Sequence, residues 1–171
     1  MKRLLILFLL GGTLPLAAQG RFALESGMTV GHMNDDTQWA SAVDVRAAFD
    51  VSRATRVVWG VSRWFDPFDT NGNYSWGGIG TDLGAQVHLA AAGPVAVRLH
   101  AVAHASVGDD GDGTLRVHAG PVVGLRLEGA VVGPLAWYVG AAGQAFIANS
   151  RGTSGRFDPG VRADGGVRVR L

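Results

Sequence analysis

Cysteine is absent from the 171-residue chain, which excludes a disulfide-stabilised scaffold and a cysteine-ligated metal site. Charged residues are also scarce: they make up 17% of the sequence, and the formal net charge is only +1. A charge balance so close to neutrality argues against a nucleic-acid partner, because nucleic-acid-binding domains carry a strong basic field. After the N-terminal region, no apolar run reaches the roughly 18 uninterrupted residues of a membrane-spanning helix. If the chain enters a membrane, we expect it to do so as strands.

The N-terminus predicts an export signal. Lys2 and Arg3 supply positive charge, residues 4–10 form a short apolar segment, and residues 16–18 end in two alanines before Gln19. Two glycines and a proline break the apolar segment, so it is too short for a stable spanning helix. We expect residues 1–18 to be a signal peptide and residues 19–171 to form one domain, with no peptidoglycan-binding domain after it. The alternative is an uncleaved membrane anchor.

Alternation of apolar and polar residues dominates the rest of the chain, and residues 38–51 (QWASAVDVRAAFDV) show it clearly. Val43 and Val45 fall on one face, whereas Asp44 and Arg46 fall on the other. Because successive side chains of a strand point to opposite faces, the pattern predicts a long two-faced strand. About ten residues, tilted by about 40°, span roughly 25 Å, the height of the apolar band of a membrane barrel.

The same alternation recurs along the chain and predicts eight strands. The expected strands are residues 21–33, 38–51, 56–66, 79–90, 95–107, 115–129, 135–147 and 157–171. Their connections are short after the second, fourth and sixth strands, and generally longer and polar after the others. The pattern favours an all-β fold, an eight-stranded antiparallel up-and-down barrel.

Three features indicate that the apolar face points to lipid, which makes the barrel transmembrane. The expected strands have about ten to thirteen residues, whereas strands of globular proteins typically have about five or six. The polar face mixes charges with glycines, which make room for arginines inside a narrow barrel. Aromatic residues on the apolar face lie near strand ends, as in a membrane girdle: Phe22, Trp39, Phe49, Trp137 and Phe157. The alternative is a secreted, lipocalin-like soluble barrel with the apolar face inside, binding a small apolar ligand.

The strand number, the loop asymmetry and the export signal together resemble the small eight-stranded outer-membrane barrels: the OmpA membrane domain, OmpX and the opacity-type proteins. The resemblance covers residues 21–171 and carries no diagnostic motif. It implies a monomer without a cofactor in the bacterial outer membrane, with short periplasmic turns and surface-exposed loops. It also implies contact with outer-membrane lipid, lipopolysaccharide and the outer-membrane assembly machinery. One departure is the C-terminus, where Leu171 stands in place of the usual aromatic residue.

Charged residues of the polar face are predicted to form ion pairs inside the barrel. An eight-stranded barrel is just wide enough for side chains to fill it, and an isolated buried charge is very costly. The predicted network consists of Asp44, Arg46, Asp82, Arg98, Arg116, Arg126, Glu128, Arg162, Asp164 and Arg168. The alternative is a gated polar conduit for small ions. Arg63, by contrast, falls among the apolar residues of the third expected strand, near the end of that strand that leads into the long loop. Lipopolysaccharide phosphates would contact it there.

Three histidines, His100, His104 and His118, share the inward phase. We expect hydrogen-bonded lumen residues and no metal, although three imidazoles could bind one. His104 and Ser106 are similar to the His-x-Ser pair of outer-membrane lipid A deacylases. In those enzymes the pair belongs on the lipid side, whereas here both residues fall inward. We therefore expect no enzyme, with a lipid A-modifying enzyme as the alternative.

Two loops, residues 67–78 and 108–114, are the candidate recognition surface, because they are the longest or most acidic of the connections. They carry Phe68, Tyr74 and Trp76, all in the first loop, and these aromatic residues belong to no predicted strand face. Aromatic residues on loops held by a rigid scaffold are common in recognition. The sequence therefore predicts a structural or surface-interaction role, and the alternative is that these rings complete the outer aromatic girdle.

Overall fold

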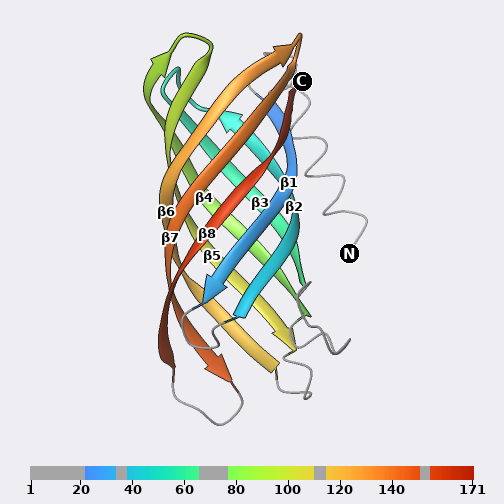
Figure 1. Ribbon diagram of the computed structural model, residues 1–171, viewed down its shortest axis with the longest axis vertical. Helices are drawn as coiled ribbons and strands as arrows, with labels where there is room; N and C mark the ends of the chain where they lie inside the picture. Colours follow the sequence, from blue (N-terminus) through green and yellow to red (C-terminus); the bar gives the residue numbers. More distant parts are fainter. Residues whose placement is uncertain (1–21, 34–37, 66–76, 110–114, 151–154) are drawn as a thin grey trace.

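The computed structural model describes residues 22–33, 38–65, 77–109, 115–150 and 155–171 (Figure 1). The predicted signal peptide lies outside the described residues, as do Phe68, Tyr74 and Trp76 of the candidate recognition surface. No helix long and apolar enough to cross a membrane occurs in the described residues.

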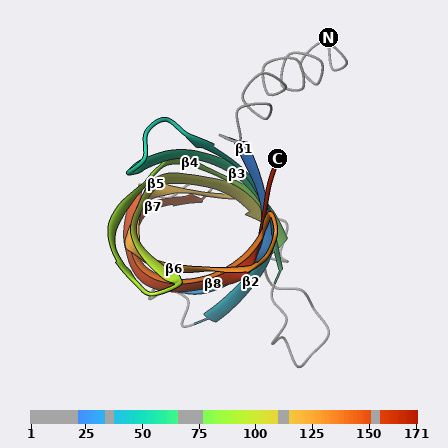
Figure 2. The same ribbon diagram turned by 90° about the horizontal axis from the view of Figure 1, so that it is seen from above.

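Eight strands form one closed antiparallel barrel in which each strand pairs with its neighbours in the chain, and β1 pairs with β8. Figure 2 shows the closed ring seen from above. The prediction of an eight-stranded antiparallel up-and-down barrel is confirmed. The strands are β1 (Phe22–Met33), β2 (Gln38–Asp50), β3 (Thr55–Phe65), β4 (Gly77–Ala92), β5 (Val95–Asp109), β6 (Leu115–Val132), β7 (Leu135–Ser150) and β8 (Arg156–Arg170).

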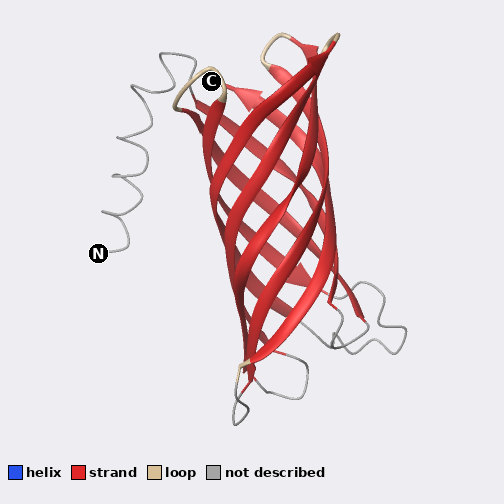
Figure 3. Cartoon of the chain, turned by 90° about the vertical axis from the view of Figure 1, so that its left-hand side faces the viewer, coloured by secondary structure: helices blue, strands red, loops and turns tan. Residues whose placement is uncertain are grey.

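Tight turns connect β2 to β3, β4 to β5 and β6 to β7 at the end of the barrel that holds the C-terminus (Figure 3). Gly93 and Gly133 take φ values of 59° and 55° there, a left-handed conformation that glycine adopts without steric cost. The end of β8 is tied to this rim, because the amide of Arg170 donates to the carbonyl of Pro134 at 3.0 Å. The amide of Leu171 donates to Phe22, also at 3.0 Å. We call this end of the barrel the turn end and the opposite end the loop end.

Several strands are longer than the alternation predicts. β4 begins at Gly77 and pairs there with Asp109, so Gly77 and Gly78 belong to the sheet and not to the preceding loop. β6 likewise continues to Val132, beyond the predicted end at residue 129. The reason is that backbone pairing across a hairpin continues up to the turn, whether or not the side chains still alternate.

The polar face points into the barrel and the apolar face points outward. In β3, for example, Arg56 is buried, whereas Val57, Trp59 and Val61 are exposed. The predicted orientation of the two faces is confirmed. A lipocalin-like arrangement would need the apolar face inside, so that alternative is wrong for the described strands.

The aromatic residues divide between the two faces. Phe22 packs against Phe49 of the neighbouring strand with ring centroids 5.0 Å apart, and is only 7% exposed. Trp137 is half-buried and Phe157 is exposed. The aromatic residues at the strand ends of the outer face are not the only large side chains, however. Three large rings fill the lumen: Trp64, Tyr138 and Phe146.

Candidate functional site in the barrel lumen

A first group of charges centres on Arg46 of β2, in the middle of the barrel. Its Nη1 donates to Oδ2 of Asp164 at 2.8 Å, and its Nη2 lies 3.4 Å from Asp44 and 3.9 Å from Asp82. Asp82 also accepts a hydrogen bond from Arg162 at 3.3 Å. These five side chains come from three strands, β2, β4 and β8, so the ion pairs tie opposite walls of the barrel together.

A second group centres on Glu128 of β6, toward the turn end. Its Oε1 accepts a hydrogen bond from Nη1 of Arg56 at 2.8 Å. Its Oε2 accepts from Nε of Arg98 at 3.1 Å and from Nη1 of Arg168 at 2.6 Å. Nε of Arg126 lies 3.9 Å from the same carboxylate. One buried acidic side chain thus draws together arginines from four strands.

Glu25 of β1 extends the second group. Its carboxylate lies 2.8 Å from Nη1 of Arg126 and 3.8 Å from Nη1 of Arg56. The guanidinium of Arg126 also stacks over the ring of Tyr138, with its central carbon 3.4 Å from the ring centroid. Such a cation–π contact supplements the ion pair in a desolvated site.

Nine of the ten predicted network residues lie in these two groups, and Arg116 is placed elsewhere. Arg116 is half-buried near the loop end of β6, opposite Gly108 of β5. The prediction also missed two central members, Glu25 and Arg56. Both fall in the inward phase of their strands, so the same alternation that selected the other residues could have found them.

Glycines make room for this network, as predicted from their mixture with charges. A Cβ atom at Gly60 would lie 2.5 Å from Cγ of Arg46, closer than real Cβ atoms approach other atoms. Gly60 is the register partner of Arg46 on the neighbouring strand. Only glycine at this position leaves space for the arginine side chain.

The three inward histidines are buried among lumen side chains. Nδ1 of His104 lies 2.7 Å from Oδ1 of Asp82, and its ring stacks on Phe146 with centroids 5.1 Å apart. Nδ1 of His100 lies 3.4 Å from Gln86. The His118 ring is tilted against the same Phe146 at 6.4 Å. No group of three or more potential ligands with metal-binding geometry occurs in the described residues.

His104 and Ser106 are both buried inside the barrel, on the inward phase of β5. The pair therefore does not face the outer apolar surface, where a lipid substrate would lie. Most of the buried charges among the described lumen residues lie beside a charge of opposite sign, which offsets the cost of burying them.

Comparison of the sequence with protein-family models and with curated proteins gives no match. Among solved structures, the chain is similar to the crystal structure of Neisserial surface protein A, with a TM-score of 0.66 and 13% sequence identity. That match covers 88% of this chain and 97% of the neisserial protein. A major outer membrane protein from Thermus thermophilus matches with a TM-score of 0.49, 13% identity, and coverage of 88% and 99%. The chain therefore shares the fold of Neisserial surface protein A, a small closed β-barrel.

Proposed function

We propose that the chain is a monomeric β-barrel of the bacterial outer membrane, with a structural or surface-interaction role. The observation that carries the proposal is a belt of exposed apolar side chains around the whole barrel. Water-soluble monomers rarely expose contiguous apolar patches larger than a few hundred Å². All eight strands contribute to the belt, through residues such as Leu24, Val43, Val61, Leu83, Val107, Leu125, Val139 and Val167.

Arg63 of β3 places a positive charge on this surface. Its side chain is exposed in the outward phase, toward the loop end, and its Nη1 donates to the carbonyl of Gly78 at 3.4 Å. A guanidinium at the edge of an apolar belt is suited to a lipid phosphate. We propose lipopolysaccharide as its contact, with outer-membrane lipid around the belt itself. The export signal at residues 1–18 and the assembly machinery would deliver the chain there.

The lumen is proposed to be closed by its ion pairs and to have no catalytic, metal-binding or cofactor-binding role. Support comes from the two groups around Arg46 and Glu128, which join opposite walls of the barrel. The buried rings of Trp64, Tyr138 and Phe146 occupy further space inside the barrel. Any specific activity then belongs to the loops, with the barrel as their rigid scaffold.

Fractionation tests the location. The full chain is expressed in a Gram-negative host, and its membranes are separated from the soluble periplasmic fraction. We expect the mature chain, without residues 1–18, in the outer-membrane pellet and in heat-modifiable form on gels. Recovery as free periplasmic protein would contradict the membrane location.

Loop replacement tests the interaction role. The loop of residues 66–76 is replaced by a short Gly-Ser turn that leaves β4 intact from Gly77 onward. We expect a barrel that assembles but loses adhesion or ligand binding at the cell surface. The matched control shortens residues 110–114 in the same way and should keep the adhesion or binding. Unchanged binding by the first variant, or its failure to assemble, would leave the loop as an anchoring element only.

A further inference from the structure

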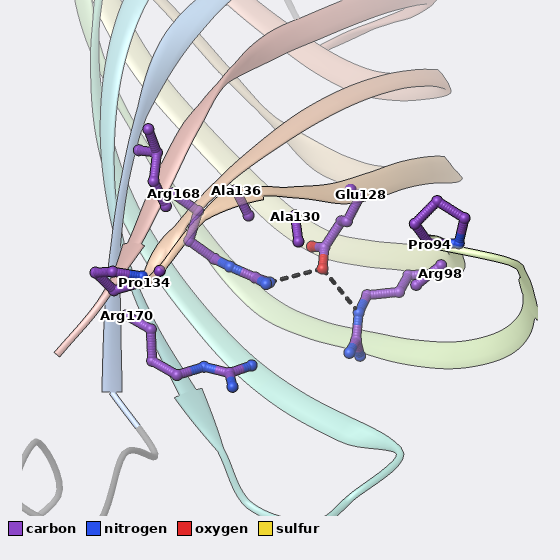
Figure 4. Close-up of a pocket in the computed structure, with 12 residues that line it drawn as sticks. Pro94, Arg98, Glu128, Ala130, Pro134, Ala136, Arg168 and Arg170 are labelled. Atoms are coloured by element: carbon purple, nitrogen blue, oxygen red, sulfur yellow. Dashed lines mark hydrogen bonds and ion pairs between the residues drawn. The ribbon is translucent and has the colours of Figure 1, made fainter.

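A pocket of about 270 Å³ opens at the turn end of the barrel, between the β4–β5 and β6–β7 turns and the end of β8 (Figure 4). Pro94, Pro134 and Leu135 supply apolar walls. Its charged lining consists of Arg98, Glu128, Arg168 and Arg170. A single water needs only about 10–15 Å³ of such space, so the pocket is large enough for a polyatomic ligand.

The charges around this pocket are out of balance. The turn-end group contains the carboxylates of Glu25, Asp50 and Glu128, which together carry three negative charges. Four arginines share them: Arg56, Arg98, Arg126 and Arg168. Arg170 lines the pocket as a fifth, exposed arginine without an ion pair to any described side chain, so the surplus is two positive charges, five minus three. A surplus of cations that includes buried and half-buried arginines is unfavourable unless an anion joins them.

The pocket arginines retain free donors for such an anion. Arg98 uses only Nε in its hydrogen bond to Glu128, and Arg168 uses only Nη1. Nε of Arg168 is buried without a hydrogen-bond partner among the described residues. Arg170 is exposed and forms no ion pair with any described side chain, and Figure 4 shows its guanidinium apart from the pair of bonds on Glu128. Each guanidinium offers five N–H donors in a planar fork.

We propose that this pocket binds a phosphate group, either as inorganic phosphate or as the monoester headgroup of phosphatidic acid. Arginine forks match the oxygens of phosphate bidentately. A phosphate monoester carries about −1.5 to −2 charges at neutral pH, which balances the surplus of two. The proline and leucine walls are compatible with an adjoining acyl chain, and the experiment separates the two sources.

The test uses the full barrel refolded in a non-ionic maltoside detergent, with calorimetric titration at constant ionic strength. One arm adds inorganic phosphate against a sodium chloride blank. The other adds short-chain phosphatidic acid in mixed micelles, against the same diacylglycerol without phosphate. Saturable binding in the first arm identifies a free-phosphate site, and saturable binding in the second arm alone identifies a headgroup site. No saturable binding in either arm overturns the proposal.

Arg170→Ala is the decisive variant, because Arg170 has no ion-pair partner among the described residues to leave unpaired. Loss of a charge-assisted contact should weaken binding by about tenfold or more. Arg53→Ala is the matched control, since Arg53 is an exposed arginine in the β2–β3 turn at the same end and outside the pocket. Arg53→Ala should bind like the parent. Equal affinities for all three proteins, or equal loss in both variants, would overturn the assignment, and neither result depends on the fractionation experiment.

Discussion

Glu128 has more arginine partners than any other carboxylate among the described residues, because four arginines lie within 3.9 Å of it. Glu128→Gln keeps the shape and the acceptor oxygen but removes the charge that these guanidinium groups share. Because removing one partner of a buried pair leaves uncompensated charge, we expect a loss of about 3–5 kcal/mol in the free energy of unfolding. Urea titration of the barrel refolded in lipid vesicles measures it.

Arg53→Gln is the control for that change. Arg53 is an exposed residue in the β2–β3 turn, and its replacement also changes the net charge of the chain by one unit. Exposed substitutions usually stay within about 0.5 kcal/mol. Equal, small effects of both variants would show that Glu128 does not hold the lumen together.

Substitution of Val45 tests whether the outer face of the barrel contacts lipid or water. It lies 50% exposed near the middle of β2. At the middle of a bilayer an outward arginine costs about 2–4 kcal/mol, falling to about 0–1 near the interfaces. We therefore expect Val45→Arg to destabilise the vesicle-refolded barrel strongly, and Val131→Arg, at the turn end of β6, to have little effect. Identical unfolding free energies for the two variants would contradict a lipid-facing belt.

At the residue scale, alternation predicts which side of the strand a residue occupies but not its height in the barrel or its partner. It correctly placed Arg46 and Asp164 inside, although their hydrogen bond joins positions 118 residues apart. Glu25 falls in the inward phase of its strand, but alternation does not show which charge will lie beside it. Its importance comes from Arg126, which only the closed barrel brings to 2.8 Å.

Among the elements, β6 and β7 show how closely the backbones of this barrel approach one another. A Cβ at Gly124 of β6 would press on the backbone of β7, lying 2.5 Å from Cα of Ala142. Gly124→Ala should therefore destabilise the barrel by about 1–3 kcal/mol, the usual cost of overpacking. Thermal unfolding followed by circular dichroism or gel mobility measures the effect.

Gly143→Ala in β7 is the matched comparison, because a Cβ there meets no atom within 4 Å. Alanine costs less conformational entropy than glycine, so this variant should be neutral or more stable by about 0.5 kcal/mol. Alternation places Gly124 in the inward phase of its strand and Gly143 in the outward phase, but it does not show how closely the neighbouring backbone approaches each of them. A Gly143→Ala variant as unstable as Gly124→Ala would mean that the strand spacing is not what separates them.

Strand order and strand number follow from the alternation and the turn residues, whereas strand ends do not. The Gly-Pro pairs at 93–94 and 133–134 mark two turns correctly. Residues 77–78 contain no side chain to alternate, so nothing in the sequence distinguishes them from a loop. Their place in β4 depends on pairing with Gly108 and Asp109 of β5, which lie about 30 residues away in the chain.

For the whole molecule, the packed lumen predicts how the barrel behaves as a channel. We propose that ion pairs between opposite walls and the buried rings of Trp64 and Phe146 close the lumen to a wide water path. In planar lipid bilayers we expect no large, stable conductance of the kind that porins show. Steady openings of porin size by the parent protein would contradict the closed lumen.

The pairing between β1 and β8, which we call the seam, closes the barrel and therefore determines when folding can be completed. Its pairs join residues 23 and 170 at one end and residues 33 and 160 at the other, so the two strands of the seam come from opposite ends of the chain. Closing a loop of about 150 residues costs about 4 kcal/mol of chain entropy, far more than closing a two-residue hairpin. Until β8 pairs with β1, the sheet therefore keeps two open edges with unpaired backbone groups. The chain needs protection from edge-to-edge aggregation until that pairing forms, and a chain truncated before β8 would be the form most prone to aggregate.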